Sequence, residues 1–507
     1  MWRGDVRAGK APVRFRARAS GARSIVFLAA ALLAAGQGRA ASNTHQSAPP
    51  LAGTYVSLAE HPRVFTTLAE LEGLAKRINS PDSYSGQRFG QLATQVAGDL
   101  AANKIWDATY SGCNIETYLY VFSFEPQDPG HAATIHSDLH LDPSARPPAG
   151  AAVVAARLAL YAALVKAGAA MPANAPSPDR AVELSKRILL AWAERGFRDE
   201  KGAFLRSASQ FCLGDGKIDP VSMTQVGLQV ARGVVYSVQA QDFLLYLGAV
   251  DDEEVRPLNT FHAAMYELIR NALNYRFVDH LDLDCNHYSN HVGAQLTGLL
   301  AAARLLDDRS KFEAVLDGGN PSISVTLPWT AYFERGIYGN DAPPNACYNN
   351  TGPDGLVSRP FFQTDAVAPG EIDDRYRNSN ASHGIGYPMF TLEWLYDMAE
   401  ILRIAGYDAY GYRGAHGQSI EMATQYYACY ARNAGFGKLV TSDNGRACPN
   451  FSQYVGKAVN GVDGNILIGA YRFPADLEIT DLEPSARTSA LSGAFATDAV
   501  RFGRWRD

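Results

Sequence analysis

Side chains that can bind a carboxylate or move a proton are concentrated at residues 286–291. The amide and imidazole groups there can donate hydrogen bonds to an anion, and an imidazole can also act as a base. The sequence therefore predicts a binding or catalytic site in this segment. The residues concerned are Asn286, His287, Tyr288, Asn290 and His291.

The segment that follows these polar residues has the spacing of a helix. Apolar residues recur there at intervals of three and four, which is the pattern of a buried helical stripe. We therefore expect a helix over residues 290–307 that is fixed in a core and holds the reactive groups at its first turn. The stripe consists of Leu296, Leu299, Leu300, Ala303 and Leu306.

A second polar cluster lies in residues 371–388, directly before another predicted helix. Its arginines could neutralise an anion, and its tyrosine lies where the loop becomes the helix. The long loop over residues 318–369 adds Trp329 as an aromatic surface for a substrate, because loops of this length in compact domains are usually functional. The candidate residues of the second cluster are Arg375, Arg377, Asn380, His383 and Tyr387.

Each of these candidates also has an ordinary structural interpretation. Asn290 could cap its helix, His291 could be a hydrogen-bonded core residue, and Tyr387 could make a hydrophobic contact at the start of its helix. Arg375 and Arg377 could form surface ion pairs with the aspartates that precede them.

A cation site is a further alternative for the first cluster. His287 and His291 are four residues apart, which is also the spacing of two metal ligands on one helical face. Asp282 and Asp284 would add carboxylates to such a site. The sequence contains no other convincing ligand set, so it predicts neither a metal nor a cofactor.

Helical periodicity dominates from residue 151 to about residue 435. The predicted helices come in pairs of similar length, without a sequence repeat of fixed period. This pattern favours an all-α fold, an (α/α) toroid of helical hairpins whose connecting loops form a cleft at one end. The predicted helices cover residues 151–170, 180–196, 224–247, 260–277, 290–307, 389–405 and 420–432.

The remaining segments are assigned by composition. Residues 41–60 form a flexible lead, residues 61–435 form the toroid, and residues 436–507 form a tail packed on it, with strand-like pieces such as residues 464–473. Aromatic residues are dense over residues 103–150 and are either core packing or platforms for sugar rings.

Residues 1–40 resemble a signal peptide. A basic start is followed by an apolar run that is too short to span a membrane and by the small-residue sequence Gly38-Arg39-Ala40. We therefore expect a periplasmic or secreted protein without a membrane span. Residues 1–40 hold eight basic residues and one acidic residue, so the net charge of −6 becomes −13 without them. That charge argues against a nucleic-acid partner.

The six cysteines include no pair with the spacing of a zinc ribbon. In an oxidising compartment they can form disulfides, and Cys429 and Cys448 are the pair closest in sequence. Spacing alone does not decide whether these two are joined.

The segment 289–308, Ser-Asn-His-Val-Gly-Ala-Gln-Leu-Thr-Gly-Leu-Leu-Ala-Ala-Ala-Arg-Leu-Leu-Asp-Asp, resembles the Asn-Asn-His segment of the alginate-lyase family of polysaccharide lyases. The segment from Tyr387 to Glu400 is similar to that family's second signature, in which a tyrosine begins a helix that runs into an Ala-Glu pair. His61-Pro-Arg63 is similar to the opening segment of related lyases. The likeness covers about residues 60–430.

The resemblance implies an (α/α) toroid that cleaves uronic-acid polysaccharides, alginate or polyglucuronate, by β-elimination without a cofactor. It assigns the family's asparagine, histidine and tyrosine to Asn290, His291 and Tyr387. The family's arginine lies a few residues before its tyrosine, whereas Arg375 and Arg377 lie further back in this chain.

Two other functions remain open at this point. A glycoside hydrolase would need two carboxylates across the cleft, for which Glu371, Asp373 and Asp374 are the candidates. A non-catalytic protein could bind a polysaccharide through the aromatic residues alone. In each case we expect a monomer or a simple homo-oligomer with an anionic polysaccharide as its partner.

Overall fold

The structure is a computed structural model that describes residues 49–110, 115–123, 149–211, 220–278, 290–341, 367–374 and 385–492. The chain divides into two units, residues 1–46 and residues 47–507, and all described residues belong to the second unit.

The described residues form helices joined by irregular segments, with isolated β-bridges and no sheet among them. In chain order the helices are α1 (Leu68–Ile78), α2 (Tyr84–Ala102), α3 (Ile115–Ser123), α5 (Ala151–Lys166), α6 (Pro178–Arg195), the short 3₁₀ helix η1 (Ala208–Gln210), α7 (Pro220–Leu247), α8 (Asp252–Val278), α9 (Asn290–Leu305), α10 (Arg309–Asp317), α11 (Trp329–Gly336), α12 (Gly386–Ile404), α13 (Ile420–Ala434), α14 (Phe451–Tyr454), α15 (Val462–Arg472), α16 (Leu477–Thr480) and α17 (Glu483–Ser492). The helices predicted from periodicity are confirmed, with α8 beginning eight residues earlier than expected.

The predicted pairing of helices is confirmed by contacts between consecutive ones. In the α5–α6 pair, Ser185 donates to the carbonyl of Ala155 at 2.9 Å. In the α7–α8 pair, Ser237 bonds His262 at 3.0 Å, and one turn later in α7 Gln241 bonds Asn259, which is earlier in α8, at 2.7 Å. The residue numbers rise in one helix as they fall in the other, so α7 and α8 are antiparallel.

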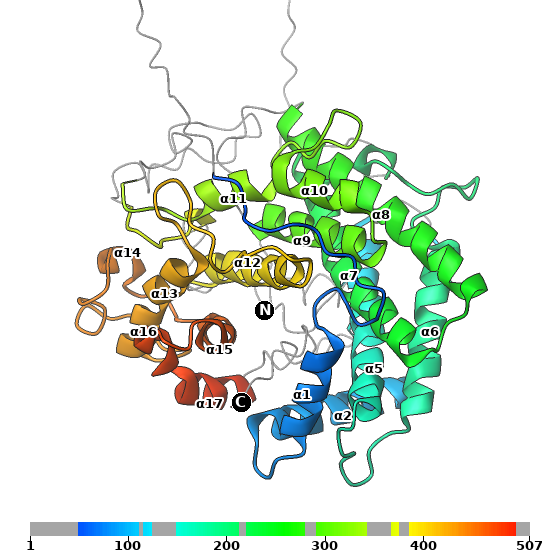
Figure 1. Cartoon of the computed structure of the whole chain (residues 1–507), viewed down its shortest axis with the longest axis horizontal. Coiled ribbons are helices and arrows are strands. Elements are labelled where there is room, and N and C mark those ends of the chain that lie inside the picture. Colours follow the sequence, from blue (N-terminus) through cyan, green and yellow to red (C-terminus); the bar gives the residue numbers. More distant parts are fainter. Residues whose placement is uncertain are drawn as a thin grey trace, which may run out of the picture. The chain divides into compact units, whose positions relative to one another are not determined.

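The helices close into a ring of contacts, which confirms the (α/α) toroid. α5 packs on α7, α7 on α9, α9 on α12, α12 on α15, α15 on α17, and α17 on α2, which packs on α5 (Figure 1). The joint between α2 and α17 includes a hydrogen bond from Arg88 to the carbonyl of Ala490 at 3.1 Å.

Helices α7 and α9, which are neighbours in this ring, run in the same direction. A side chain at Gly227 of α7 would come within 2.7 Å of Gln295 in α9, and one at Gly298 of α9 would come within 3.0 Å of Ala231 in α7. Residue numbers therefore rise in the same direction along α7 and α9, so these two helices are parallel. Glycine is needed where their backbones approach most closely. The ring thus places the first turns of α7 and α9 at the same end.

The segment around His61-Pro62-Arg63 lies at the opposite end of these helices. Asp242, near the end of α7, accepts hydrogen bonds from the backbone of Arg63 at 2.9 Å and of Val64 at 3.0 Å, and its other oxygen lies 2.5 Å from the ring of His61. The Arg63 guanidinium donates to the carbonyl of Leu305, the last residue of α9, at 2.9 Å. This segment therefore satisfies polar groups at the helix ends.

The described residues after 435 form turns and four helices, and the predicted strand over residues 464–473 is wrong. Helix α15 (Val462–Arg472) occupies that position, because it is buried against α12 and α13, where its apolar residues pack from several sides. Its start lies beside the start of α12, since Asn465 donates to the carbonyl of Met389 at 3.1 Å.

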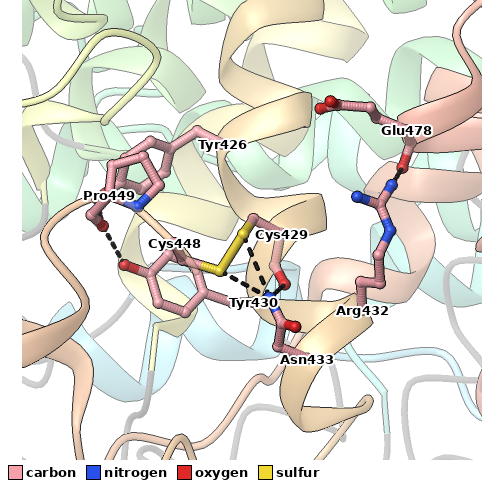
Figure 2. Close-up of a disulfide and its surroundings, with 8 residues drawn as sticks. All are labelled: Tyr426, Cys429, Tyr430, Arg432, Asn433, Cys448, Pro449 and Glu478. Atoms are coloured by element: carbon pink, nitrogen blue, oxygen red, sulfur yellow. Dashed lines mark hydrogen bonds between the residues drawn. A yellow bond between two sulfur atoms is a disulfide. The ribbon is translucent and has the colours of Figure 1, made fainter. Parts of the chain in front are cut away.

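A disulfide between Cys429 and Cys448 ties α13 to the segment that follows it, which settles the pairing that the sequence left open. Figure 2 shows the bond with Asn433, whose amide group lies 3.4 Å and 3.2 Å from the two sulfurs. Beside it, Tyr430 donates to the carbonyl of Pro449. The segment 437–460 is thereby fixed against α13.

The described aromatic residues of the segment 103–150 belong to the core. Tyr118 and Phe122 of α3 are buried and contact Trp192 with ring centroids 5.6 Å and 4.6 Å apart. For these rings the packing interpretation is correct, and they offer no face to a sugar. His131, His136 and His140 lie outside the described residues.

Candidate functional site

The candidate site is organised by one buried carboxylate, Asp374, which joins the first turn of α9 to the second turn of α12. Its Oδ2 atom accepts a hydrogen bond from the backbone nitrogen of Asn290 at 2.9 Å and from the Thr391 hydroxyl at 3.0 Å. Asn290 is the first residue of α9, and Thr391 lies in the second turn of α12. The described members of the two sequence clusters, Asn290, His291 and Tyr387, therefore lie at the same end of two adjacent helices.

The carboxylate also suits the electrostatics of that position. The first backbone N–H groups of a helix have no partner within the helix, and the helix dipole makes this end positive. Asp374 satisfies the first N–H group of α9 from another part of the chain and brings a negative charge to its positive end. In one interpretation of the sequence, the Asn290 side chain was the cap of this helix. In the structure the Asp374 carboxylate caps the helix by accepting from the Asn290 backbone.

The short segment that carries Asp374 is anchored on several sides. Tyr338 donates to Asp373 at 2.5 Å, and the backbone nitrogen of Ile372 donates to Tyr427 of α13 at 3.1 Å. Glu371 accepts from Asn450 at 2.9 Å and from Tyr454 at 2.8 Å. The last two donors come from the segment that the disulfide fixes, so the position of Asp374 depends on helices far apart in the sequence.

Of the tyrosines around Glu371, Tyr454 donates a hydrogen bond to its carboxylate, and Tyr427 accepts one from the Ile372 backbone. Burial, followed by the negative charge of Glu371, raises the pKa of the Tyr427 and Tyr454 phenols well above their ordinary value. Both phenols therefore keep their protons near neutral pH, and Tyr454 can donate to the carboxylate.

Tyr387 is half-buried at the start of α12, one turn before Thr391. Its ring meets the edge of Phe390, with centroids 6.3 Å apart. Phe390 is 42% exposed, whereas most of the other aromatic residues that the structure describes are buried. The two rings form an aromatic surface at the same helix end.

Asn290 and His291 form the first two positions of α9. Asn290 is 6% exposed, and His291 is half-buried. The rest of α9 is buried on all sides, including Gln295, Thr297 and Arg304, so the helix has no solvent-facing stripe and cannot shift without disturbing the core. This is a rigid support for the two polar residues at its start.

Most of the other predicted site residues lie outside the described part of the chain. This holds for the whole remainder of the first cluster and for the residues of the second cluster before Tyr387. They are Asn286, His287, Tyr288, Arg375, Arg377, Asn380 and His383, and their roles remain predictions.

The structure corrects the expectation that Trp329 contacts substrate. Trp329 is 0% exposed and packs against Phe333 and Tyr412, with ring centroids 5.0 Å and 5.1 Å apart. Its position at the start of α11 places its indole in the core instead of on a loop surface, so no face of the ring is open to a sugar.

The three carboxylates considered for a glycoside hydrolase are buried as well. Glu371, Asp373 and Asp374 are at most 1% exposed, and each holds a hydrogen bond to a neighbouring element. A hydrolase would need two carboxylates that reach the substrate, and these three do not. Their role is structural.

Sequence reasoning missed the roles of three residues in this site. Asp374 was considered only as a hydrolase carboxylate or a partner of the arginines, and Thr391 and Phe390 were not considered. A hydroxyl among apolar residues of the predicted helix was the available signal for Thr391. Nothing in the sequence indicates that Phe390 is exposed.

Two findings describe the chain more generally. Over the described ranges, no group of three or more histidine, cysteine, aspartate or glutamate side chains could hold a metal ion, although residues 282–287 lie outside those ranges. No helix in the described part of the chain is long and apolar enough to cross a membrane.

No protein-family model matches this chain, and no curated protein matches its sequence. Among solved structures, the chain is similar to an alginate lyase from Bacteroides ovatus, with a TM-score of 0.47 and 10% sequence identity over 84% of this chain and 95% of that one. The fold given above follows from the contacts of this chain's own helices.

Proposed function

We propose that the protein is a polysaccharide lyase that cleaves a uronic-acid polymer, of the alginate or polyglucuronate type, by β-elimination. The observation that carries the proposal is the shared bond of Asn290 and Thr391 to Asp374. It brings an asparagine, a histidine and a tyrosine of the expected types to one end of two adjacent helices that are fixed in the core.

The chemistry requires three functions at that place. A base takes the proton from C5 of the uronate, the electron pair forms the double bond between C4 and C5, and the bond from C4 to the leaving oxygen breaks while that oxygen receives a proton. Hydrogen-bond donors must also stabilise the charge that develops on the carboxylate. The products are one saturated chain end and one 4,5-unsaturated end.

The described residues can be assigned to these functions. The side chain of Asn290, at the positive end of α9, would donate to the uronate carboxylate. Tyr387 would move the proton to the leaving oxygen, and His291 or the same tyrosine would take the proton from C5. Arg375 or Arg377 is proposed to neutralise the carboxylate further.

Phe390 would provide a surface for a sugar ring beside the reacting one. Its exposure and its contact with Tyr387 support this role, because an aromatic face can cover the apolar C–H groups of a sugar. An export signal over residues 1–40 would place the enzyme in the periplasm or outside the cell, where such polymers occur.

The deciding test is the variant Tyr387→Phe on a panel of uronic-acid polymers, with product formation followed by ultraviolet absorbance of the unsaturated ends. The ring and its packing remain, so the unfolding free energy should change by less than about 1 kcal/mol. Loss of the phenol oxygen should lower kcat by about 100-fold, the usual effect of a positioned acid or base, with little change in KM.

The matched control is Tyr471→Phe, which removes the same oxygen from a tyrosine that is 41% exposed in the last turn of α15. It should keep the wild-type kcat. A hydrolase would release only saturated ends, and a binding protein would leave the polymer intact. Wild-type elimination by a folded Tyr387→Phe protein would refute the assignment and transfer it to Tyr288.

A further inference from the structure

The bond network at the start of α9 and α12 gives Asp374 more than a packing role. We infer that Asp374 is a positioning residue, which sets the distance between Asn290 and His291 on one helix and Tyr387 on the other, through hydrogen bonds to the Asn290 backbone and the Thr391 hydroxyl. The inference rests on the proposed function and adds a residue that does not touch the substrate.

The geometry of the two bonds supports this inference. Both donors reach the same oxygen, at 2.9 Å and 3.0 Å, so the two helix starts cannot separate without lengthening at least one bond. Asp374 and Thr391 are both 0% exposed, so water cannot replace a lost partner without entering the core. Thr391 is one helical turn from Tyr387 on the same helix, so a shift of Thr391 also moves the Tyr387 phenol.

The carboxylate is itself held from outside the two helices. Its neighbour Asp373 is bonded to Tyr338, and Ile372 is bonded through its backbone to Tyr427. Asp374 is therefore a fixed point to which both helix starts are attached, instead of a side chain that follows either helix. A displacement of about 1 Å between reacting groups can reduce a rate by about 100-fold, so such a fixed point has a measurable kinetic effect.

The test compares Thr391→Val with Thr391→Ser. Valine has the shape of threonine but no hydroxyl, and it leaves the Asn290 bond to Asp374 intact. Serine keeps the hydroxyl. We expect Thr391→Val to lower kcat by about 10-fold with KM changed less than about twofold, because binding groups remain while the relative placement of Tyr387 is loosened. Thr391→Ser should recover most of the wild-type kcat.

Thr424→Val is the matched control. Thr424 is 1% exposed, and its hydroxyl bonds Tyr396 at 2.6 Å and the Ile420 carbonyl at 2.8 Å. Tyr396 is nine residues beyond Tyr387, or about 14 Å along α12. The control removes a buried threonine hydroxyl at a similar cost in stability but should keep kcat and KM. Asp374→Ala, which removes both bonds, should lower kcat by about 100-fold if it folds.

A second measurement does not depend on activity. Hydrogen exchange of the amides in residues 290–294 should be about 10-fold faster in Thr391→Val than in Thr424→Val, because Asp374 loses one of the donors that fix it and therefore holds the start of α9 less firmly. Equal kcat in the valine and serine variants, or faster exchange with an unchanged kcat, would overturn the positioning role.

The two proposals can fail separately. A wild-type protein that forms no unsaturated product on any polymer overturns the lyase proposal. The exchange rates then decide whether Asp374 holds the two helix starts together: faster exchange in Thr391→Val than in Thr424→Val supports it, and equal exchange overturns it.

Discussion

His262 offers a test of the packing of α7 on α8 that is independent of any function. Its side chain lies between α7 and α8, is 0% exposed, and has one ring nitrogen 3.0 Å from the Ser237 hydroxyl. Burial lowers the pKa of this imidazole from its ordinary 6.5 to about 3. The folded protein therefore keeps His262 neutral over most of the acidic range, whereas the unfolded chain does not.

The sign of the effect follows from proton binding. Between about pH 3 and pH 6.5 the unfolded chain binds a proton at His262 that the folded chain does not bind. The contribution of the neutral His262 side chain to the unfolding free energy is therefore present above pH 6.5. As the pH falls below 6.5, the unfolding free energy decreases by about 1.4 kcal/mol per pH unit. From pH 6.5 to pH 5 this amounts to about 2 kcal/mol.

The variant His262→Leu isolates this contribution. It should cost about 1 kcal/mol or less near pH 7.5, since Ser237 also donates to the Val234 carbonyl at 3.2 Å and keeps a partner. In urea unfolding, the unfolding free energy should decrease between pH 7.5 and pH 5 by about 2 kcal/mol less in the variant than in the wild type. Ser237→Ala, which keeps the buried ring, should retain the wild-type loss. If the difference between wild type and His262→Leu is the same at both pH values, the imidazole is not buried as described.

Two further predictions concern the surface of the site and the disulfide. Phe390→Ala should raise KM about fivefold, which corresponds to roughly 1 kcal/mol of lost apolar contact, with kcat nearly unchanged. Leu477→Ala, at a side chain that is 69% exposed on α16, is the control and should leave KM unchanged. An equal KM for the two variants would show that Phe390 does not contact the substrate. Replacing Cys429 and Cys448 by serine should lower the unfolding free energy by about 3 kcal/mol, since the bond closes a loop with a sequence separation of 19. Thermal unfolding with and without a reducing agent would check it, and identical curves would contradict it.

Much of the fold could be predicted from local sequence. The three- and four-residue spacing of apolar side chains is a property of each helix alone, so α5, α6, α9, α12 and α13 were found close to their observed limits. The hydroxyl of Thr67, the residue directly before α1, accepts from the backbone of Glu70 at 3.3 Å and caps the helix. Local hydrogen bonding of this kind needs no tertiary contact.

Other features depended on contacts between distant segments. Residues 464–473 alternate enough to suggest a strand, but burial against α12 and α13 makes them helical. Trp329 lies in a segment that reads as a loop, yet α11 directs its ring into the core. In both cases the sequence window was too short to contain the surfaces against which the residues pack.

The candidate site shows the same division. The sequence by itself determined which side chains are available and that Asn290, His291 and Tyr387 begin helices. Only the tertiary structure decided that these two helix starts lie at one end, because the link between them is a carboxylate 84 residues from Asn290 and 17 from Thr391. A buried acid is stable only where donors from other elements converge on it, and that convergence is a property of the folded chain.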